Sequence, residues 1–381
     1  MKIGIFGGTY NPVHRSHIDT ALLVYRELQL DKLLMIVASD PPHKKVADGV
    51  SAGTRLKMVD LSIQGLDGIV SSDMEIRRGG KSYTLDTLLQ LKKIYPDDEL
   101  YLTVGSDMLQ DLPNWHEVDD IFGLCTVVAV PRAGYEQDDR AAVENLKKRY
   151  GAKVIELHVH LRKISSTCIR RLLKEGRPIT GLVEESVEQF IYESGIYFPE
   201  DVKEIQKRLR ETIDPERYRH TMAVVRRAAD LAERYGMDPI RVRTAALLHD
   251  CAKSMDKQKL LLYSGEDEFY PNVVHATGGG VVAMKKFGIR DEGILRAIRQ
   301  HCTGDAGMDD LSKLIYLADM SEYTRDYPCV DEIRNACDIS LDEGMRISIL
   351  RAVRHLEERN LSIHPATIRA LHYYTSKEAS S

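Results

Sequence analysis

A pair of histidines, His14 and His17, follows a pair of glycines in the opening string MKIGIFGGTYNPVHRSH. Gly7 and Gly8 allow the backbone to turn sharply and to approach a ligand closely. From Ser16 onward the pattern becomes helical, so both imidazoles stand at a helix entrance, where free N–H groups and the helix dipole favour an anion. Histidines at this spacing are more often surface or capping residues than catalysts. Together with the glycine turn, however, they predict a phosphate site.

Residues that could ligate a metal are spread over the second half of the chain. They are four histidines and two aspartates, namely His220, His249, Asp250, His275, His301 and Asp319. Each falls in or beside a helix-like stretch. A single buried histidine usually has a structural explanation, and an adjacent His-Asp pair can arise by chance. As a complete set, mixed imidazole and carboxylate ligands suit iron, manganese, cobalt or zinc rather than thiolate chemistry.

The first half of the chain alternates apolar runs with helix-like periods. The runs predict strands at residues 2–6, 33–38, 68–74, 100–104 and 125–130, and a helix is expected at residues 55–66. Asp107 comes just after one of these strands, where open α/β sheets bind ligands. Trp115 follows in a loop, and stacking on an aromatic ligand or plugging the core are equally plausible roles for it. This half is predicted to be an α/β domain.

Beyond a polar, proline-bearing boundary near residue 198, one helix-like stretch follows another. An apolar stripe runs from Val224 to Tyr235 and ends at Gly236. Asp238 and Pro239 then form a typical helix start, as N-cap and first helical residue. We therefore predict an all-α domain at residues 199–381, after an α/β domain at residues 1–198.

The composition is that of a folded protein of two domains. The chain has 381 residues, of which 43% are hydrophobic and 29% charged. Its net charge of −5 argues against general nucleic-acid or membrane-surface binding.

No apolar run is long enough to cross a bilayer, and no signal sequence is expected. The six cysteines form no CxxC pair and suggest reduced thiols. We expect a cytoplasmic protein without nucleic-acid or membrane partners, and homo-oligomerisation stays open.

The opening string resembles the signature GG-T-F-x-P-x-H-x-G-H of the Rossmann-like nucleotidyltransferases. A second string, ISSTCIR from Ile164 to Arg170, is similar to the ISSTxIR motif that closes the same family. Together with a YTLDTL segment from Tyr83, these motifs resemble nicotinate-mononucleotide adenylyltransferases over residues 1–198. Pantetheine-phosphate adenylyltransferases are relatives, but they usually carry threonine in place of His14. One departure is Ser16, which replaces the usual glycine.

This resemblance implies AMP transfer from ATP to nicotinate mononucleotide, with release of pyrophosphate, and it assigns roles to individual residues. His14 and His17 would hold the ATP phosphates with the help of Mg²⁺, and Asp107 would meet the nucleoside end of ATP. The remaining substrate-binding residues implied are Gly7, Gly8, Thr9, Lys44, Thr84, Trp115, Arg132, Ser166, Thr167 and Arg170. The reaction needs positioning and charge stabilisation more than a covalent nucleophile.

In the second half, the strings RHTMAVV, AALLHDCAK, AIRQHCTG and LIYLADMSE occur in an order similar to that of HD-domain phosphohydrolases. They most resemble the bacterial symmetrical diadenosine tetraphosphate hydrolases. The sequence departs from that family around His275 and at Ser321-Glu322-Tyr323, where the family reads I-E-P.

The resemblance implies two divalent metals, with iron as the first expectation and manganese, cobalt or zinc as alternatives. One metal would be held by His220, His249, Asp250 and Asp319, and His275 and His301 would complete the second. Asp250 would bridge the cations, which would acidify a water that attacks a phosphorus and releases two ADP. Two alternatives remain for this half: hydrolysis of another nucleotide phosphate, or a non-catalytic regulatory module. A nucleotide sensor that binds ATP without transfer remains the alternative for the first half.

Overall fold

The computed structural model describes residues 1–42, 45–130, 136–157, 162–265 and 270–376. The chain divides into two compact units. Unit 1 comprises Met1–Arg171 and Ile179–Phe190, and unit 2 comprises Leu172–Pro178 and Ile191–Ser381. The predicted domain boundary after residue 198 stays a prediction.

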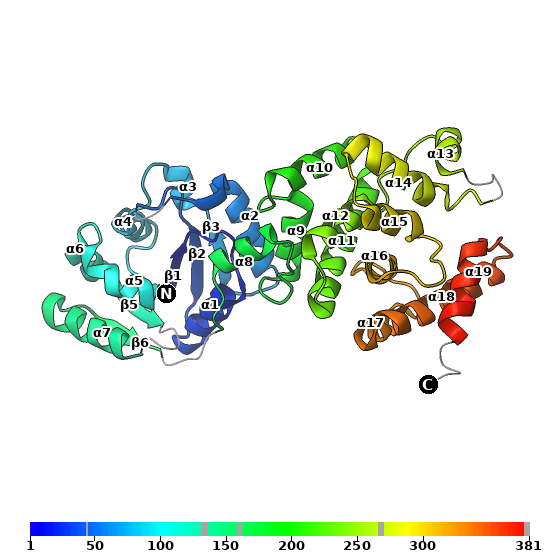
Figure 1. Cartoon of the computed structure of the whole chain (residues 1–381). Helices are drawn as coiled ribbons and strands as arrows, with labels where there is room; N and C mark the ends of the chain where they lie inside the picture. The colour runs from blue at the N-terminus through cyan, green and yellow to red at the C-terminus, as the bar shows by residue number, and fades with distance from the viewer. Residues whose placement is uncertain (43–44, 131–135, 158–161, 266–269, 377–381) are drawn as a thin grey trace. The chain divides into compact units, whose positions relative to one another are not determined.

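Unit 1 is built on a six-stranded sheet with the order β3-β2-β1-β4-β5-β6 (Figure 1). Its strands are β1 (Lys2–Gly8), β2 (Lys32–Val37), β3 (Ile69–Ser72), β4 (Glu99–Gly105), β5 (Thr126–Val130) and β6 (Val154–Glu156). Every pair of neighbouring strands is parallel. The strand predicted at residues 68–74 was too long, because β3 ends at Ser72 and Met74 already begins a helix.

Helices and short 3₁₀ turns connect these strands or follow the last of them. They are α1 (Arg15–Glu27), η1 (Ala47–Gly49), α2 (Ala52–Ile63), α3 (Met74–Arg78), α4 (Thr84–Ile94), α5 (Ser106–Asp111), η2 (Leu112–Asn114), α6 (Val118–Leu124), α7 (Glu136–Tyr150), α8 (Ser166–Lys174) and α9 (Glu185–Ser194). The parallel strands are apolar along most of their length because helices cover the sheet. The predicted α/β class of this half is therefore confirmed.

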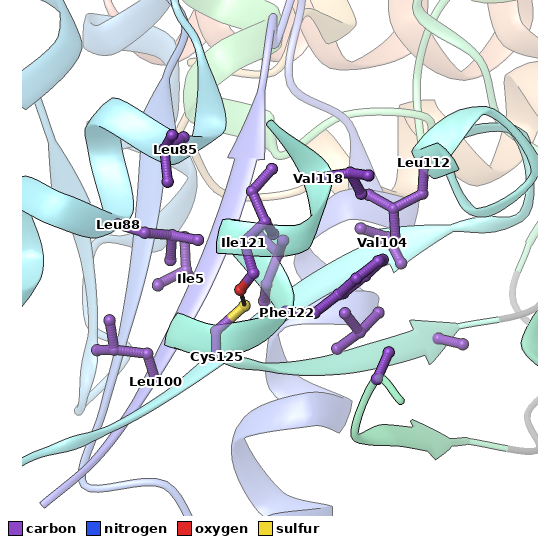
Figure 2. Packing of buried hydrophobic residues seen from close by; sticks show 14 of the residues in the cluster. Ile5, Leu85, Leu88, Leu100, Val104, Leu112, Val118, Ile121, Phe122 and Cys125 are labelled. Atoms are coloured by element: carbon purple, nitrogen blue, oxygen red, sulfur yellow. Dashed lines mark hydrogen bonds between the residues drawn. The ribbon is translucent and has the colours of Figure 1, made fainter. Parts of the chain in front are cut away.

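A hydrophobic core joins one face of the sheet to the helices that follow it (Figure 2). Ile5 of β1 and Leu100 of β4 pack with Leu88 of α4 and Ile121 of α6. The thiol of Cys125 donates a hydrogen bond of 3.3 Å to the carbonyl of Ile121. Full burial of a side chain such as Leu88 contributes about 1.5–3 kcal/mol to folding. This packing holds the carboxyl ends of the strands in place.

The elements of unit 2 from Glu200 onward are all helices in the described part of the chain (Figure 1). They are α10 (Glu200–Arg210), α11 (Pro215–Tyr235), α12 (Pro239–Leu248), α13 (Lys257–Ser264), α14 (Val274–Phe287), α15 (Glu292–Gln300), α16 (Asp310–Ser321), α17 (Val330–Ile339), α18 (Leu341–Glu358) and α19 (Pro365–Ser376). The prediction of an all-α second half is confirmed.

The boundaries of α11 and α12 follow from local chemistry. Gly236 ends α11 with a φ of 61°, a left-handed conformation that glycine adopts without steric cost. The Asp238 carboxylate then accepts hydrogen bonds from the amides of Ile240 and Arg241, which would otherwise lack partners at the start of α12. Both boundaries were predicted from these residue types. None of the described helices has the length and apolar character needed to span a membrane.

Candidate phosphate site and candidate metal centre

His14 and His17 lie together at the start of α1, directly after the loop that leaves β1. His14 is the N-cap residue, and its backbone amide donates a 3.2 Å hydrogen bond to Nδ1 of His17. The two imidazoles stack, with ring centroids 3.7 Å apart and planes inclined by 27°. Because Nδ1 of His17 accepts this bond, a neutral His17 carries its proton on Nε2. The geometry therefore aligns two imidazoles with the positive end of a helix.

Tyr10 fills the space behind this histidine pair. Its ring meets Phe6 and His17 edge-on, at centroid distances of 6.0 Å and 5.1 Å, and its hydroxyl donates a 2.6 Å bond to the carbonyl of Phe6. Burial raises the pKa of Tyr10 well above its ordinary value, so the hydroxyl stays protonated. A Cβ on Gly8 would lie 2.8 Å from the Tyr10 ring, which explains the need for glycine there.

Arg55 of α2 holds two loops near the histidine pair, a role that no motif or spacing in the sequence indicated. It is only 1% exposed. Its guanidinium donates to the carbonyl of Thr9 at 2.7 Å and to the carbonyl of Ser39 at 3.2 Å. Thr9 precedes the histidines and Ser39 follows β2. Arg55 thus ties the loop after β1 to the loop after β2.

The structure brings the ISSTCIR string to the opening string. The hydroxyl of Ser166 donates a 2.9 Å bond to the carbonyl of Pro12. Arg170 donates to the carbonyl of Asn11 at 2.7 Å and pairs with the carboxylate of Asp48 at 3.1 Å. Two motifs that lie more than 150 residues apart therefore meet at one backbone loop.

The other residues predicted for this site occupy several elements of unit 1. Thr84 begins α4, Asp107 lies exposed in the first turn of α5, and Trp115 follows η2 and packs partly against the core. Lys44 and Arg132 lie outside the described residues. The substrate-binding roles of all these residues stay predictions.

In unit 2, the six predicted metal ligands come together from five places in the helical fold. They are His220 in α11, His249 and Asp250 after α12, His275 in α14, His301 after α15 and Asp319 in α16. Their ligand atoms form three groups, and within each group these atoms lie within 4.8 Å of one another. The groups are His220–His249–Asp250, His249–His301–Asp319 and Asp250–His275–His301.

Asp250 occupies the middle of this cluster and is only 3% exposed. One of its carboxylate oxygens, Oδ1, lies 3.2 Å from Nε2 of His275 and 3.4 Å from Nε2 of His301. The other, Oδ2, lies 3.7 Å from Nε2 of His249. Each oxygen faces a different part of the ligand set, so this carboxylate could contribute an oxygen to each of two cations.

Backbone carbonyls orient two of the histidines. Nδ1 of His249 lies 2.7 Å from the carbonyl of Ala246, and Nδ1 of His301 lies 2.8 Å from the carbonyl of Ile298. A carbonyl can only accept, so both Nδ1 atoms carry protons. Nε2 of each ring is then the ligating atom, as is usual where the other ring nitrogen is hydrogen-bonded.

Burial and charge leave His249, His275 and Asp250 in the protonation states that a metal requires. Burial lowers the pKa of His249 and of His275 to about 4, so both rings are neutral at neutral pH. Burial raises the pKa of Asp250, but the facing imidazoles outweigh it and hold this pKa well below its usual range. Neutral imidazoles around ionised carboxylates fit divalent cations. Burial also lowers the pKa of His220, but the hydrogen bonds to Asp319 and Glu322 outweigh burial and raise this pKa.

Four further charged side chains border the cluster. Arg217 donates a 2.9 Å bond to Oδ2 of Asp250, and Lys253 places Nζ 3.0 Å from Nε2 of His275. Arg325 donates a 2.7 Å bond to Oδ1 of Asp319. Glu322 lies 3.3 Å from Nδ1 of His220.

Of these four residues, Arg217 and Glu322 were not predicted from the sequence as parts of the site. A signal was available for Arg217, because it precedes His220 by three positions and so shares its helix face. Glu322 lies just past the end of α16, where helical spacing no longer applies.

Comparisons with known proteins separate the same two halves. Residues 5–172 match the cytidylyltransferase-like family, and residues 217–324 match the HD domain. The chain is 39% identical over 212 residues to the "Probable nicotinate-nucleotide adenylyltransferase" of Geobacter sp. (strain M21), which covers 52% of this chain and 98% of that protein. It is also 39% identical over 197 residues to the protein of that name from Gloeobacter violaceus, covering 51% and 96% respectively.

Among solved structures, the chain is similar to a crystal structure from Clostridium acetobutylicum, described as a "predicted HD superfamily hydrolase involved in NAD metabolism". The two are 30% identical, the match covers 46% of this chain and 97% of that one, and the TM-score is 0.44.

Proposed function

The chain belongs to the nicotinate-nucleotide adenylyltransferase family, and on that premise we propose that unit 1 transfers AMP from ATP to nicotinate mononucleotide. A phosphate oxygen of the mononucleotide would form a bond to the α-phosphorus of ATP, and the bond from that phosphorus to the β-phosphate would break. The products are nicotinate adenine dinucleotide and pyrophosphate. The proposed catalytic domain covers residues 1–198.

The observation that carries this proposal is the stacked pair of His14 and His17 at the start of α1. Negative charge grows on the phosphates as the bond to the leaving group breaks, and fixed donors stabilise that charge most effectively. Nε2 of His17 and the amides of the first helical turn are such donors. Mg²⁺ bound with ATP would add charge neutralisation. Ser166 and Arg170 hold the adjoining loop and support binding of the departing pyrophosphate.

Replacing His17 tests this assignment in the full-length chain. His17→Ala should lower single-turnover synthesis of the dinucleotide from ATP and nicotinate mononucleotide by about 10²–10³-fold, the usual cost of losing one such donor. His116→Ala, which removes an exposed histidine of the same unit, is the matched control. Near-parental synthesis by His17→Ala would refute the catalytic role. ATP binding without transfer by the parent chain would instead favour a nucleotide sensor.

For unit 2 we propose metal-dependent hydrolysis of a nucleotide polyphosphate, with symmetrical cleavage of diadenosine tetraphosphate to two ADP as the specific reaction. The HD-domain match and the buried His/Asp cluster support this class of hydrolase. His220, His249, Asp250 and Asp319 would hold one divalent cation, and His275 and His301 would complete the site of a second. Two divalent cations held by these residues would supply a water of lowered pKa and would polarise a phosphoryl oxygen.

The surrounding residues would bind the substrate phosphates. Lys253 and Arg217 place positive charge beside His275 and Asp250, at the border of the cluster. A phosphate oxygen would offer Lys253 a stronger acceptor than the neutral imidazole of His275 does. Arg217 has further N–H donors besides the one that meets Asp250, and these could bind a phosphate oxygen. Iron is the proposed native metal, and manganese, cobalt and zinc suit the same donors.

A panel of substrates tests the specific reaction. Diadenosine tetraphosphate should be converted to two ADP by the chain loaded with iron, manganese, cobalt or zinc in turn. Diadenosine triphosphate, ATP and ADP serve as comparison substrates. Preferential release of phosphate from one of these would favour hydrolysis of another nucleotide. A chain that binds metal but hydrolyses none of them would favour the regulatory module.

A further inference from the structure

The imidazole of His220 lies between two carboxylates that have different surroundings. Its Nε2 is 3.0 Å from Oδ1 of Asp319, on the side of the other predicted ligands. Its Nδ1 is 3.3 Å from Oε1 of Glu322, on the opposite side of the ring. Glu322 is only 1% exposed, and among the described residues it belongs to none of the groups that could hold a metal. Burying a carboxylate is unfavourable unless the charge is paired and hydrogen-bonded, so the contacts of Glu322 require an explanation.

Local hydrogen bonds fix the Glu322 carboxylate in place. The backbone amide of Thr324 donates to one oxygen, and the Thr324 hydroxyl donates to the other at 2.8 Å. Arg325 adds positive charge, with Nε 3.6 Å from Oε1. These contacts leave Oε1 facing the His220 ring, and they stabilise the ionised form of the carboxylate.

The turn that carries Glu322 is also braced against α11, the helix that carries His220. Arg227 donates a 3.1 Å bond from Nε to the hydroxyl of Ser321. The Arg226 guanidinium lies 4.2 Å from the centroid of the Tyr323 ring, and the Tyr323 hydroxyl donates to Asp230. The residues on both sides of Glu322 are therefore tied to the same helix as His220, which keeps carboxylate and imidazole at a constant separation.

We propose that Glu322 is the positioning residue of the metal centre and holds His220 for ligation through Nε2. Its carboxylate accepts a hydrogen bond from Nδ1–H of His220. The lone pair of the neutral ring is then on Nε2, which faces the ligand cluster. The negative charge also makes the imidazole a stronger electron donor to a cation. This inference rests on the proposed metal centre, and it goes beyond the six ligands by naming the residue that orients one of them.

Binding of Co²⁺ to the full-length protein tests the proposal, because the visible absorption of Co²⁺ reports its ligand geometry. Glu322→Gln keeps the size of the side chain and can still accept from Thr324, but it removes the charge. We expect its Co²⁺ affinity to fall 10–100-fold and its absorption bands to change, which is the usual effect of losing such a partner. Glu343→Gln is the matched control, since it removes the same charge from an ion pair with Arg346 on α18.

Each result decides a different point. Parental affinity and an unchanged spectrum in Glu322→Gln would overturn the positioning role and leave the metal centre intact. A parent chain that binds no Co²⁺ would overturn the metal centre and the positioning role with it.

If Glu322→Gln fails to fold by circular dichroism, Tyr323→Phe replaces it, because this variant keeps Glu322 but removes the bond to Asp230. A severalfold weaker Co²⁺ affinity in Tyr323→Phe would support the proposal, and parental affinity would overturn it.

Discussion

At the scale of single residues, two kinds of side chain occur around the candidate phosphate site. His14 and His17 stand where a phosphate would bind, whereas Arg55 acts on backbone carbonyls of the surrounding loops. A guanidinium suits that second task because it presents several donors in a fixed plane. The position of the histidines therefore depends on a residue that need not touch the substrate.

Arg55→Lys tests this dependence. Lysine keeps the charge but cannot donate to the carbonyls of Thr9 and Ser39 with the same geometry, so at least one buried carbonyl loses its partner. We expect kcat/KM for dinucleotide synthesis to fall about 10-fold or more, while unit 1 still folds. Steady-state kinetics and thermal unfolding measure the two effects. Parental kcat/KM would show that the loops keep their positions without Arg55.

The predicted ligands in unit 2 contact different numbers of other ligands, so their substitutions should affect metal binding to different degrees. Asp250 faces His249, His275 and His301, so Asp250→Ala should abolish diadenosine tetraphosphate hydrolysis and remove most bound metal. His301 is proposed to serve only the second metal, so His301→Ala should keep part of the metal but lose most activity. Elemental analysis and ADP release measure these effects. Parental ADP release by both variants would refute the two-metal mechanism.

At the scale of the element, helix α1 brings the groups of the candidate phosphate site together at its N-terminus. Its N-terminus combines the free amides of a first helical turn with two imidazoles, and its apolar face, which includes Ile18, Ala21 and Val24, is buried. The carbonyl of Ser16 accepts a 2.7 Å bond from the hydroxyl of Thr20, one turn later. The helix start is thus held by both packing and hydrogen bonds.

Ser16→Gly tests whether the Ser16 side chain contributes to this helix start. Glycine costs up to about 1 kcal/mol inside a helix but less near an end, so the change in the free energy of unfolding should stay below that value. We expect dinucleotide synthesis to be retained, with a shifted KM for ATP. Steady-state kinetics at varied ATP concentration provide the measurement. Complete loss of activity would mean that the Ser16 hydroxyl has become part of phosphate binding.

At the scale of the whole molecule, each unit carries its own core and its own candidate site. Helices of unit 2 bury many apolar side chains that cannot ligate a metal, among them Val224 of α11, Leu248 of α12 and Leu314 of α16. We therefore expect the fold of unit 2 to survive loss of its metals.

Removing metal from the full-length chain tests this separation. Dialysis against a chelator, followed by return of Mg²⁺ alone, should abolish diadenosine tetraphosphate hydrolysis and leave dinucleotide synthesis at the parental rate. Helical content should stay the same, and added Fe²⁺, Mn²⁺ or Co²⁺ should restore hydrolysis. Circular dichroism and the two activity assays provide the readouts. Loss of helical content on chelation would mean that the metals stabilise the fold of unit 2.

Much of the fold could be predicted from the sequence, because the relevant signals act between neighbouring residues. Apolar runs indicated the strands of the parallel sheet, and Gly236 and Asp238 marked a helix end and a helix start through their own backbone and side-chain chemistry. The residue types of the candidate metal ligands were likewise visible, since imidazole and carboxylate are donors in any context. The end of β3 was misplaced, because Met74 is equally apolar in a strand or in a helix. The helix expected at residues 55–66 lies at Ala52–Ile63, and the short strand β6 was not predicted.

The tertiary structure alone decided which partners these residues meet. Arg55 contacts the carbonyls of Thr9 and Ser39, and Glu322 contacts His220 from more than 100 residues away. No period or motif connects such positions, because a hydrogen bond to a distant backbone atom depends on how separate elements pack. An isolated arginine or glutamate in a sequence most often predicts a solvated charge. Burial beside one specific acceptor or donor becomes visible only when the helices and strands have come together.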